Sequence, residues 1–216
     1  MKKRMIAVIC VVCILLAVPA GYMIRTRGSV RVKSQSDYTA EKTVYFLQKD
    51  PQWGDEKLGS SSYTMAGSGC LTACIASALQ MQNIAVSEIQ KASDGDSGKT
   101  ITPGILNKYF SEQGVYDSKG NIQWIALEKT LGVEIVKRKA GELRNGELDT
   151  LLSKGVFPIV YVRMYGVGSF HFVLITGSVN GEFLCMDPLN EKQVEVPLSR
   201  YGGRIYAVRY IAEKNS

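Results

Sequence analysis

The chain has 216 residues, of which 45% are hydrophobic and 21% are charged, a composition that fits one globular domain with an appendage. Its formal net charge is +6, but eight of the 26 Lys and Arg residues precede Val44, against two of the 20 Asp and Glu residues. The sequence from Val44 onward is therefore near neutral, and it shows no basic patch with interleaved aromatic residues. These features exclude nucleic acid as an expected partner.

The first 25 residues are predicted to be a signal or membrane-anchoring segment. Positions 5–24 contain no charged residue, and twenty residues in a helix at about 1.5 Å per residue span roughly the 30 Å of a bilayer's hydrocarbon core. Two interpretations stay open: an uncleaved signal anchor that contacts the bilayer through residues 5–24, and a signal peptide cleaved after Ala20. Both place the rest of the chain on the extracytoplasmic side, as a single-pass membrane protein or as a secreted one.

A polar, aperiodic linker is predicted over residues 26–43, followed by one domain over residues 44–216. Helical spacing of apolar residues, together with capping signals, predicts five helices in the first part of this domain. Thr102 and Asn121 are the predicted N-caps of the third and fourth helices, and Pro103 occupies the first turn of the third. The predicted helices cover residues 70–81, 86–93, 102–114, 121–132 and 146–155.

The second part of the domain changes to segments rich in Val, Ile, Tyr and Phe that are separated by Gly, Asn and Pro, a pattern typical of strands. Asn180-Gly181 between two of them predicts a two-residue hairpin turn. The fold class is therefore predicted as α+β, with N-terminal helices packed on one face of a C-terminal antiparallel sheet. The predicted strands cover residues 157–165, 169–179, 182–188, 192–198 and 204–212.

His171 is the only histidine in the chain, so any reaction that needs an imidazole base must use it. A lone histidine in an apolar strand is also typical of a hydrogen-bonded core residue. Cys70 follows a glycine and begins an apolar helix, and a helix N-terminus carries roughly half a positive charge, which favours a thiolate there. The two residues are therefore a candidate nucleophile and base.

Asp187 ends the strand that follows the predicted hairpin and could orient the ring of His171, although an aspartate before a proline is also typical of a simple turn. An ideal turn at 180–181 pairs Leu174 with Asp187, which puts the carboxylate on the sheet face opposite His171. A one-residue bulge or a different loop length is therefore required if Asp187 is to reach the imidazole.

Three cysteines follow the N-terminal segment, so at least one has no partner within the domain. Cys70 and Cys74 lie four residues apart on one predicted helix, which disfavours a disulfide between them. Cys185 is predicted to be a core residue or, in an oxidising compartment, a partner of Cys74. A zinc site built from these three cysteines and His171 is disfavoured, because the paired Cys-x₂-Cys spacing and a His-Glu-x-x-His helix are both missing.

Four stretches, in the order FLQKDPQWGDEKLG, GSGCLTACIASALQ, SFHFVLITG and CMDPL, resemble the C39-like branch of the papain-like cysteine peptidases. The resemblance covers about residues 45–211 and implies a papain-like fold. It implies that Cys70 is the nucleophile, that His171 is the general base and acid, and that Asp187 orients the imidazole.

The same resemblance implies a role for Gln48, in the pattern Gln-x-Asp-x-x-Trp. Its amide and the backbone N–H of Cys70 would bind the oxyanion that forms on the substrate carbonyl. Without the resemblance, Gln48 is typical of an exposed polar residue at a strand end. Gly69 and Leu71, on either side of the cysteine, are the predicted substrate contacts, and many relatives have glycine where this chain has Leu71.

These observations predict an extracytoplasmic cysteine peptidase that hydrolyses peptide bonds of a peptide or protein substrate, without a metal or another cofactor and as a monomer. Two alternatives stay open. One is a non-catalytic binding module for extracytoplasmic peptides or cell-wall material, built on the same scaffold. The other is an amide transferase that uses the same residues but passes the acyl group to an amine instead of water.

Overall fold

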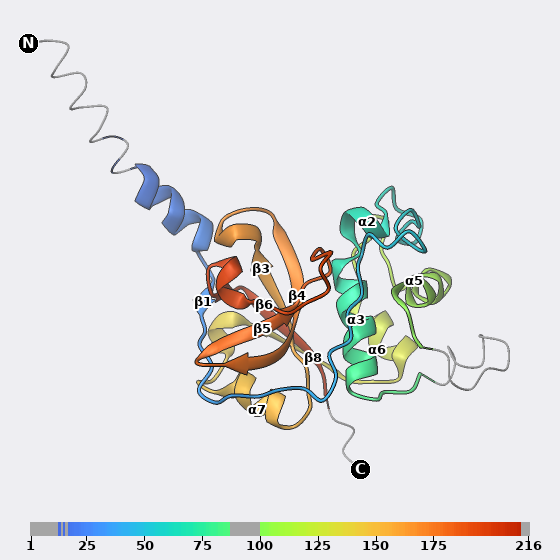
Figure 1. Ribbon diagram of the computed structural model, residues 1–216. Coiled ribbons are helices and arrows are strands. Elements are labelled where there is room, and N and C mark those ends of the chain that lie inside the picture. Colours follow the sequence, from blue (N-terminus) through green and yellow to red (C-terminus); the bar gives the residue numbers. More distant parts are fainter. Residues whose placement is uncertain (1–12, 14, 16, 87–99, 213–216) are drawn as a thin grey trace, which may run out of the picture.

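Helices and an antiparallel sheet form two parts of the domain that meet along one central helix, as Figure 1 shows. The computed structural model describes residues 13, 15, 17–86 and 100–212. The α+β class predicted from the sequence is confirmed. The helices are α2 (Met65–Ser68), α3 (Cys70–Met81), α5 (Pro103–Glu112), α6 (Trp124–Leu131) and α7 (Glu147–Ser153).

Side-chain capping accounts for the start of α5 but not for the start of α6. Thr102 is the N-cap of α5, where its hydroxyl accepts a hydrogen bond from the Ile105 N–H at 3.3 Å, as predicted. The predicted cap at Asn121 is wrong, because α6 begins three residues later and the Asn121 N–H donates instead to Asp117 Oδ1 at 2.8 Å. The carboxylate of Asp117 thus holds a turn that delays the helix. The helix predicted over residues 86–93 falls almost entirely outside the described residues.

Six strands form the main sheet in the order β2-β8-β3-β4-β5-β6, with all neighbours antiparallel. The sequence analysis missed β2, and the segment predicted over 204–212 forms two strands instead of one. The segment predicted over 192–198 contributes only two residues to the sheet. The strands are β1 (Val30–Arg31), β2 (Ile135–Lys139), β3 (Ile159–Arg163), β4 (Phe170–Val179), β5 (Glu182–Met186), β6 (Val196–Pro197), β7 (Arg204–Ile205) and β8 (Ala207–Ile211).

The core lies between α3 and the sheet, and α3 contacts β3 and β4 directly. Eight consecutive residues of α3, from 72 to 79, are buried, so this helix is enclosed on nearly all sides. Such a helix cannot rotate without exposing apolar surface to water, which costs roughly 25 cal/mol for each Å². The start of α3, where Cys70 lies, is therefore held at a fixed position relative to β4.

A bulge interrupts the pairing of β4 with β5. Ile175 pairs with Cys185 and Gly177 pairs with Leu184, so Thr176 is the extra residue. This confirms the one-residue bulge that the sequence required, and it puts the chain after β5 on the sheet face of His171. The side chain of the bulged residue is also held, because the Thr176 hydroxyl donates to Glu195 Oε1 at 2.6 Å.

Part of the predicted linker is bound to the domain. In β1, residues 30–31 pair with β7, and Tyr38 forms a β-bridge with Ser178 on β4. Ser34 hydrogen-bonds Asp149 on α7 at 2.5 Å. The linker over residues 26–43 is therefore shorter than predicted, because the sheet offers these residues backbone partners that a polar sequence pattern does not reveal.

The N-terminal segment is described only in part. Residues 17–26 are helical, whereas most of the stretch predicted to cross a membrane, including residues 5–12, lies outside the described residues. Within the described part of the chain, no helix has the length and apolar character needed to span a bilayer.

Candidate active site

Cys70 is the first residue of α3 and follows the short helix α2 through Gly69. A methyl group on Gly69 would lie 2.6 Å from the Met65 carbonyl oxygen, so only glycine allows α2 and α3 to approach this closely. The first N–H groups of a helix have no partner within it and attract negative charge. The chain thus presents a half-buried thiol at a helix N-terminus.

The other two cysteines of the domain, Cys74 and Cys185, are unpaired thiols that lie fully buried. Burial raises the pKa of both thiols well above the ordinary value, because a thiolate is poorly solvated there. The Cys74 thiol donates to the Phe172 carbonyl oxygen at 3.6 Å. Of the three thiols in the domain, Cys70 alone is exposed to solvent.

His171 and Asp187 form a buried pair. The imidazole Nε2 lies 2.7 Å from Asp187 Oδ1, and His171 is only 4% exposed. The Cys70 sulfur lines the same cavity as His171 and acts to raise the pKa of the imidazole. Because Nε2 is engaged by the carboxylate, Nδ1 is the ring nitrogen that is left to interact with the Cys70 sulfur.

His171 and Asp187 each favour the charged form of the other. Burial by itself lowers the pKa of His171, but the hydrogen bond to Asp187 and the further interactions with Cys70 and Asp187 outweigh it and raise the pKa to about 9. Burial raises the pKa of Asp187, but its interactions with His171 and its other hydrogen-bond donors lower it overall. At neutral pH the pair is therefore an imidazolium and a carboxylate.

Asp187 is itself held by donors that the sequence analysis missed. The Tyr201 hydroxyl donates to Asp187 Oδ2 at 2.5 Å, and the Leu189 N–H donates to Oδ1 at 2.8 Å. Burial and the Asp187 charge raise the pKa of Tyr201, which keeps the phenol neutral and able to donate. A tyrosine at the end of a short 3₁₀ helix, Leu198–Tyr201, gives no sequence signal for this contact.

Gln48 lies beside the same group and is 3% exposed. Its backbone N–H donates to the Pro188 carbonyl oxygen at 3.0 Å, which ties it to the chain just after Asp187. Its Nε2 donates to the Ala66 carbonyl oxygen at 2.7 Å, and this bond uses one of the two N–H groups of the amide. The Trp53 indole donates to the Leu47 carbonyl oxygen at 2.8 Å and fixes the turn that carries Gln48.

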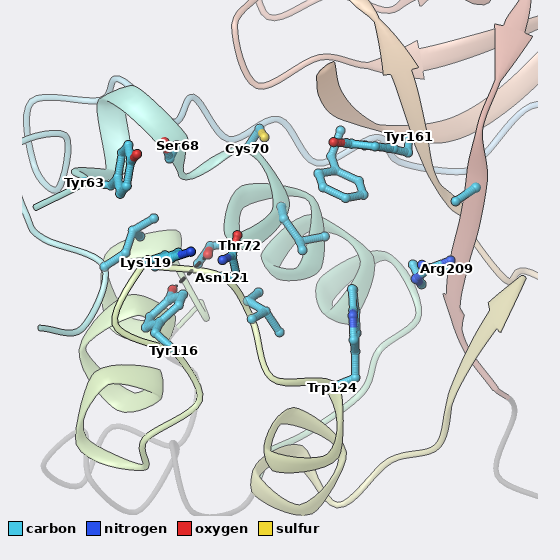
Figure 2. Close-up of a pocket in the computed structure, with 16 residues that line it drawn as sticks. Tyr63, Ser68, Cys70, Thr72, Tyr116, Lys119, Asn121, Trp124, Tyr161 and Arg209 are labelled. Carbon is cyan, nitrogen blue, oxygen red and sulfur yellow. Dashed lines mark hydrogen bonds between the residues drawn. The ribbon is translucent and has the colours of Figure 1, made fainter. Parts of the chain in front are cut away.

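Two cavities meet at Cys70. A cavity of about 260 Å³ is lined by Gln48, Cys70 and His171, among others. A larger groove of about 500 Å³ also has Cys70 in its lining, and Figure 2 shows the aromatic side chains that surround it. Tyr161 and Phe172 line both cavities. A peptide bound at the sulfur would therefore have two adjoining cavities available to it.

The two predicted substrate contacts differ in position. Leu71 lines the larger groove, and its contact with a substrate stays a prediction. Gly69 is buried against Met65 and lines neither cavity, so its place in the structure is to let α2 turn into α3. Among the described residues, no three of the His, Cys, Asp and Glu side chains are grouped as metal ligands.

No protein-family model matches the chain, and no curated protein sequence matches it either. Among solved structures, it is similar to a crystal structure described as that of a "putative C39-like peptidase from Bacillus anthracis". The two chains are 14% identical, the TM-score is 0.45, and the match covers 83% of this chain and 99% of that chain. A likeness at this level says nothing about activity, which has to be inferred from the residues of this chain.

Proposed function

We propose that the protein is a cysteine peptidase with a papain-like arrangement, in which Cys70 attacks the carbonyl carbon of a peptide bond. The observation that carries this proposal is the buried pair of His171 and Asp187, joined at 2.7 Å, in the lining of the cavity to which Cys70 also belongs. An imidazolium beside a thiol at a helix N-terminus stabilises the thiolate, which is the reactive form.

The proposed reaction uses each of these groups in turn. The Cys70 thiolate adds to the carbonyl carbon, and the oxyanion accepts hydrogen bonds from the Cys70 backbone N–H and the second N–H of the Gln48 amide. The His171 imidazolium then gives its proton to the leaving amine, which breaks the C–N bond and leaves a thioester on Cys70. Neutral His171 next takes a proton from water, whose oxygen attacks the thioester and releases the acid.

A covalent probe tests this assignment. A peptidyl vinyl sulfone is expected to add to Cys70 in the purified wild-type protein, and intact-mass spectrometry with peptide mapping locates the adduct. The His171→Ala variant is expected to react far more slowly, because its thiolate lacks the imidazolium. Equal labelling of the two proteins, or an adduct on another residue, would contradict the proposal. Reversible binding of peptides without any adduct would instead indicate the non-catalytic binding module.

The contribution of Gln48 is a separate prediction. Gln48→Ala is expected to lower kcat for peptide hydrolysis by about 10²–10³-fold with little change in KM, because one oxyanion donor is lost. Gln52→Ala is the matched control, since the Gln52 side chain is exposed and only its backbone N–H contacts Asp50. Equal kcat values for the two variants would show that the Gln48 amide does not act on the oxyanion.

We also propose that the domain acts outside the cytoplasm, tethered through residues 5–24 or released after cleavage. The support for this is the uncharged N-terminal stretch of the sequence. Labelling of intact cells with a membrane-impermeant maleimide, compared between the full chain and its Cys70→Ser variant, tests it. Labelling of Cys70 only after the cells are permeabilised would place the domain inside.

A further inference from the structure

The larger groove beside Cys70 combines aromatic walls with positive charge. No Asp or Glu is among the described residues that line it, whereas two cations, Lys119 and Arg209, are. Figure 2 shows Arg209 near Trp124 on one side of the groove and Lys119 on the other side, with Cys70 between them at the rim. The aromatic residues of the lining are Tyr63, Tyr116, Trp124, Tyr161 and Phe172.

Arg209 is held in place by the sheet without a counter-ion. It lies on β8, between β2 and β3, and its Nη1 donates to the carbonyl oxygens of Arg138 at 3.1 Å and Val208 at 2.7 Å. Its guanidinium carbon lies 5.2 Å from the centre of the Trp124 ring. Its Nε is buried and has no hydrogen-bond partner within the described residues. The guanidinium is thus fixed by contacts with uncharged groups.

The neighbouring charged groups do not neutralise Arg209. Lys137, its cross-strand partner on β2, is paired with Glu128 at 3.3 Å. The charge of Glu142 acts on Arg209, but this carboxylate accepts a hydrogen bond from the Lys139 N–H at 2.9 Å and forms no ion pair with Arg209. Within the described residues, Arg209 has no carboxylate at ion-pair distance. A partly buried cation in this state gains from any anion that enters the groove.

We propose that the groove binds peptides through an acidic side chain, Asp or Glu, that pairs with Arg209 within a few residues of the cleaved bond. This inference rests on the proposed peptidase function and names the substrate class of the same site. The remaining nitrogen of the fixed guanidinium, Nη2, has no hydrogen-bond partner among the described residues and can donate to a carboxylate, which adds a directional contact to the charge attraction. The Trp124 ring beside it covers the apolar part of the same side chain.

Matched peptides test the inference on the wild-type protein. A set of fluorogenic peptides carries either Glu or Gln at each of three positions on either side of the cleaved bond, and kcat/KM is measured for every pair. At one position, Glu is expected to be favoured over Gln by about tenfold, as for a hydrogen bond to a charged group. The preference should shrink at high salt, because screening weakens the attraction. Equal rates for Glu and Gln at every position would overturn the inference.

Two variants assign the preference to Arg209. Arg209→Gln is expected to lose the Glu preference, whereas Arg144→Gln, an exposed arginine outside the groove, is expected to keep it. A preference for Glu that persists in Arg209→Gln would show that another group binds the acidic side chain. Circular dichroism checks that Arg209→Gln is folded. If it is not, the comparison of Glu and Gln peptides with the wild-type protein still tests the inference.

A binding measurement separates this inference from the peptidase proposal. Cys70→Ala is tested for binding to the same Glu and Gln peptides, with fluorescence anisotropy as the readout. Tighter binding of a Glu peptide, without cleavage by the wild type, would support the binding of acidic residues in the groove and contradict the peptidase proposal. Cleavage of all peptides at equal rates, with equal binding, would support the peptidase proposal and contradict the binding of acidic residues in the groove.

Discussion

Replacing Cys70 with serine is expected to lower kcat/KM for peptide hydrolysis by at least about 10⁴-fold, even though the two side chains differ by one atom. A hydroxyl is a far weaker acid than a thiol, so the His171 and Asp187 pair cannot generate the nucleophile. The imidazolium that favours a thiolate also leaves no neutral base to take a proton from serine. Hydrolysis of a fluorogenic peptide, with active-site titration by the vinyl sulfone, measures the loss.

Cys74→Ala and Cys185→Ala are the matched controls for this substitution. Both thiols are buried, so their loss is expected to lower stability while the folded protein keeps most of its activity. Activity retained in Cys70→Ser, or abolished in a correctly folded Cys74→Ala protein, would contradict the assignment of the nucleophile.

Replacing Asp187 with alanine is expected to slow hydrolysis by about 10²–10⁴-fold and to move the alkaline limit of kcat/KM to lower pH. In the wild type the imidazolium persists until the pH rises through the pKa of His171, about 9. The variant keeps the burial that lowers this pKa and loses the hydrogen bond and charge that raise it. The imidazolium is therefore lost at lower pH, and activity falls with it.

Tyr201→Phe provides the comparison for this effect. It removes one hydrogen bond to Asp187 but keeps the carboxylate beside the ring, so the alkaline limit should stay closer to that of the wild type. A pH profile of kcat/KM for the three proteins distinguishes the two kinds of change. An alkaline limit that is the same in Asp187→Ala as in the wild type would show that Asp187 does not set the charge of His171.

The parts of the fold and site that the sequence predicts are those encoded locally. Helix α3 has an apolar face, α5 has Thr102 as its cap, and Asn180-Gly181 forms the predicted turn between β4 and β5. The bulge could be inferred because side chains alternate between the two faces of a strand. His171 and Asp187 can share one face only if the pairing of the two strands shifts by one residue. The position of the bulge at Thr176 could not be inferred, since Glu195 and Tyr38 contact this region from distant parts of the chain.

The parts that the sequence does not predict depend on contacts across the chain. The strand β2 contains three basic residues in its five, which is typical of an edge strand but gives no clear strand signal. Tyr201 reaches Asp187 only because the chain folds back after β6. The charge of the groove arises because Arg209 on β8 and Trp124 on α6 meet there, although 85 positions separate them in the sequence.

The single histidine of the chain permits a direct test of the pairing between Cys70 and His171. In untagged protein with ¹³C-labelled histidine, one imidazole signal is followed by NMR as the pH is raised. We predict a pKa of about 9 for the wild type and a lower one in Cys70→Ala, because the variant loses the contribution of Cys70 that raises the pKa of His171. A pKa at or below 6.5 in the wild type, or one that Cys70→Ala leaves unchanged, would contradict the pairing on which the proposed function depends.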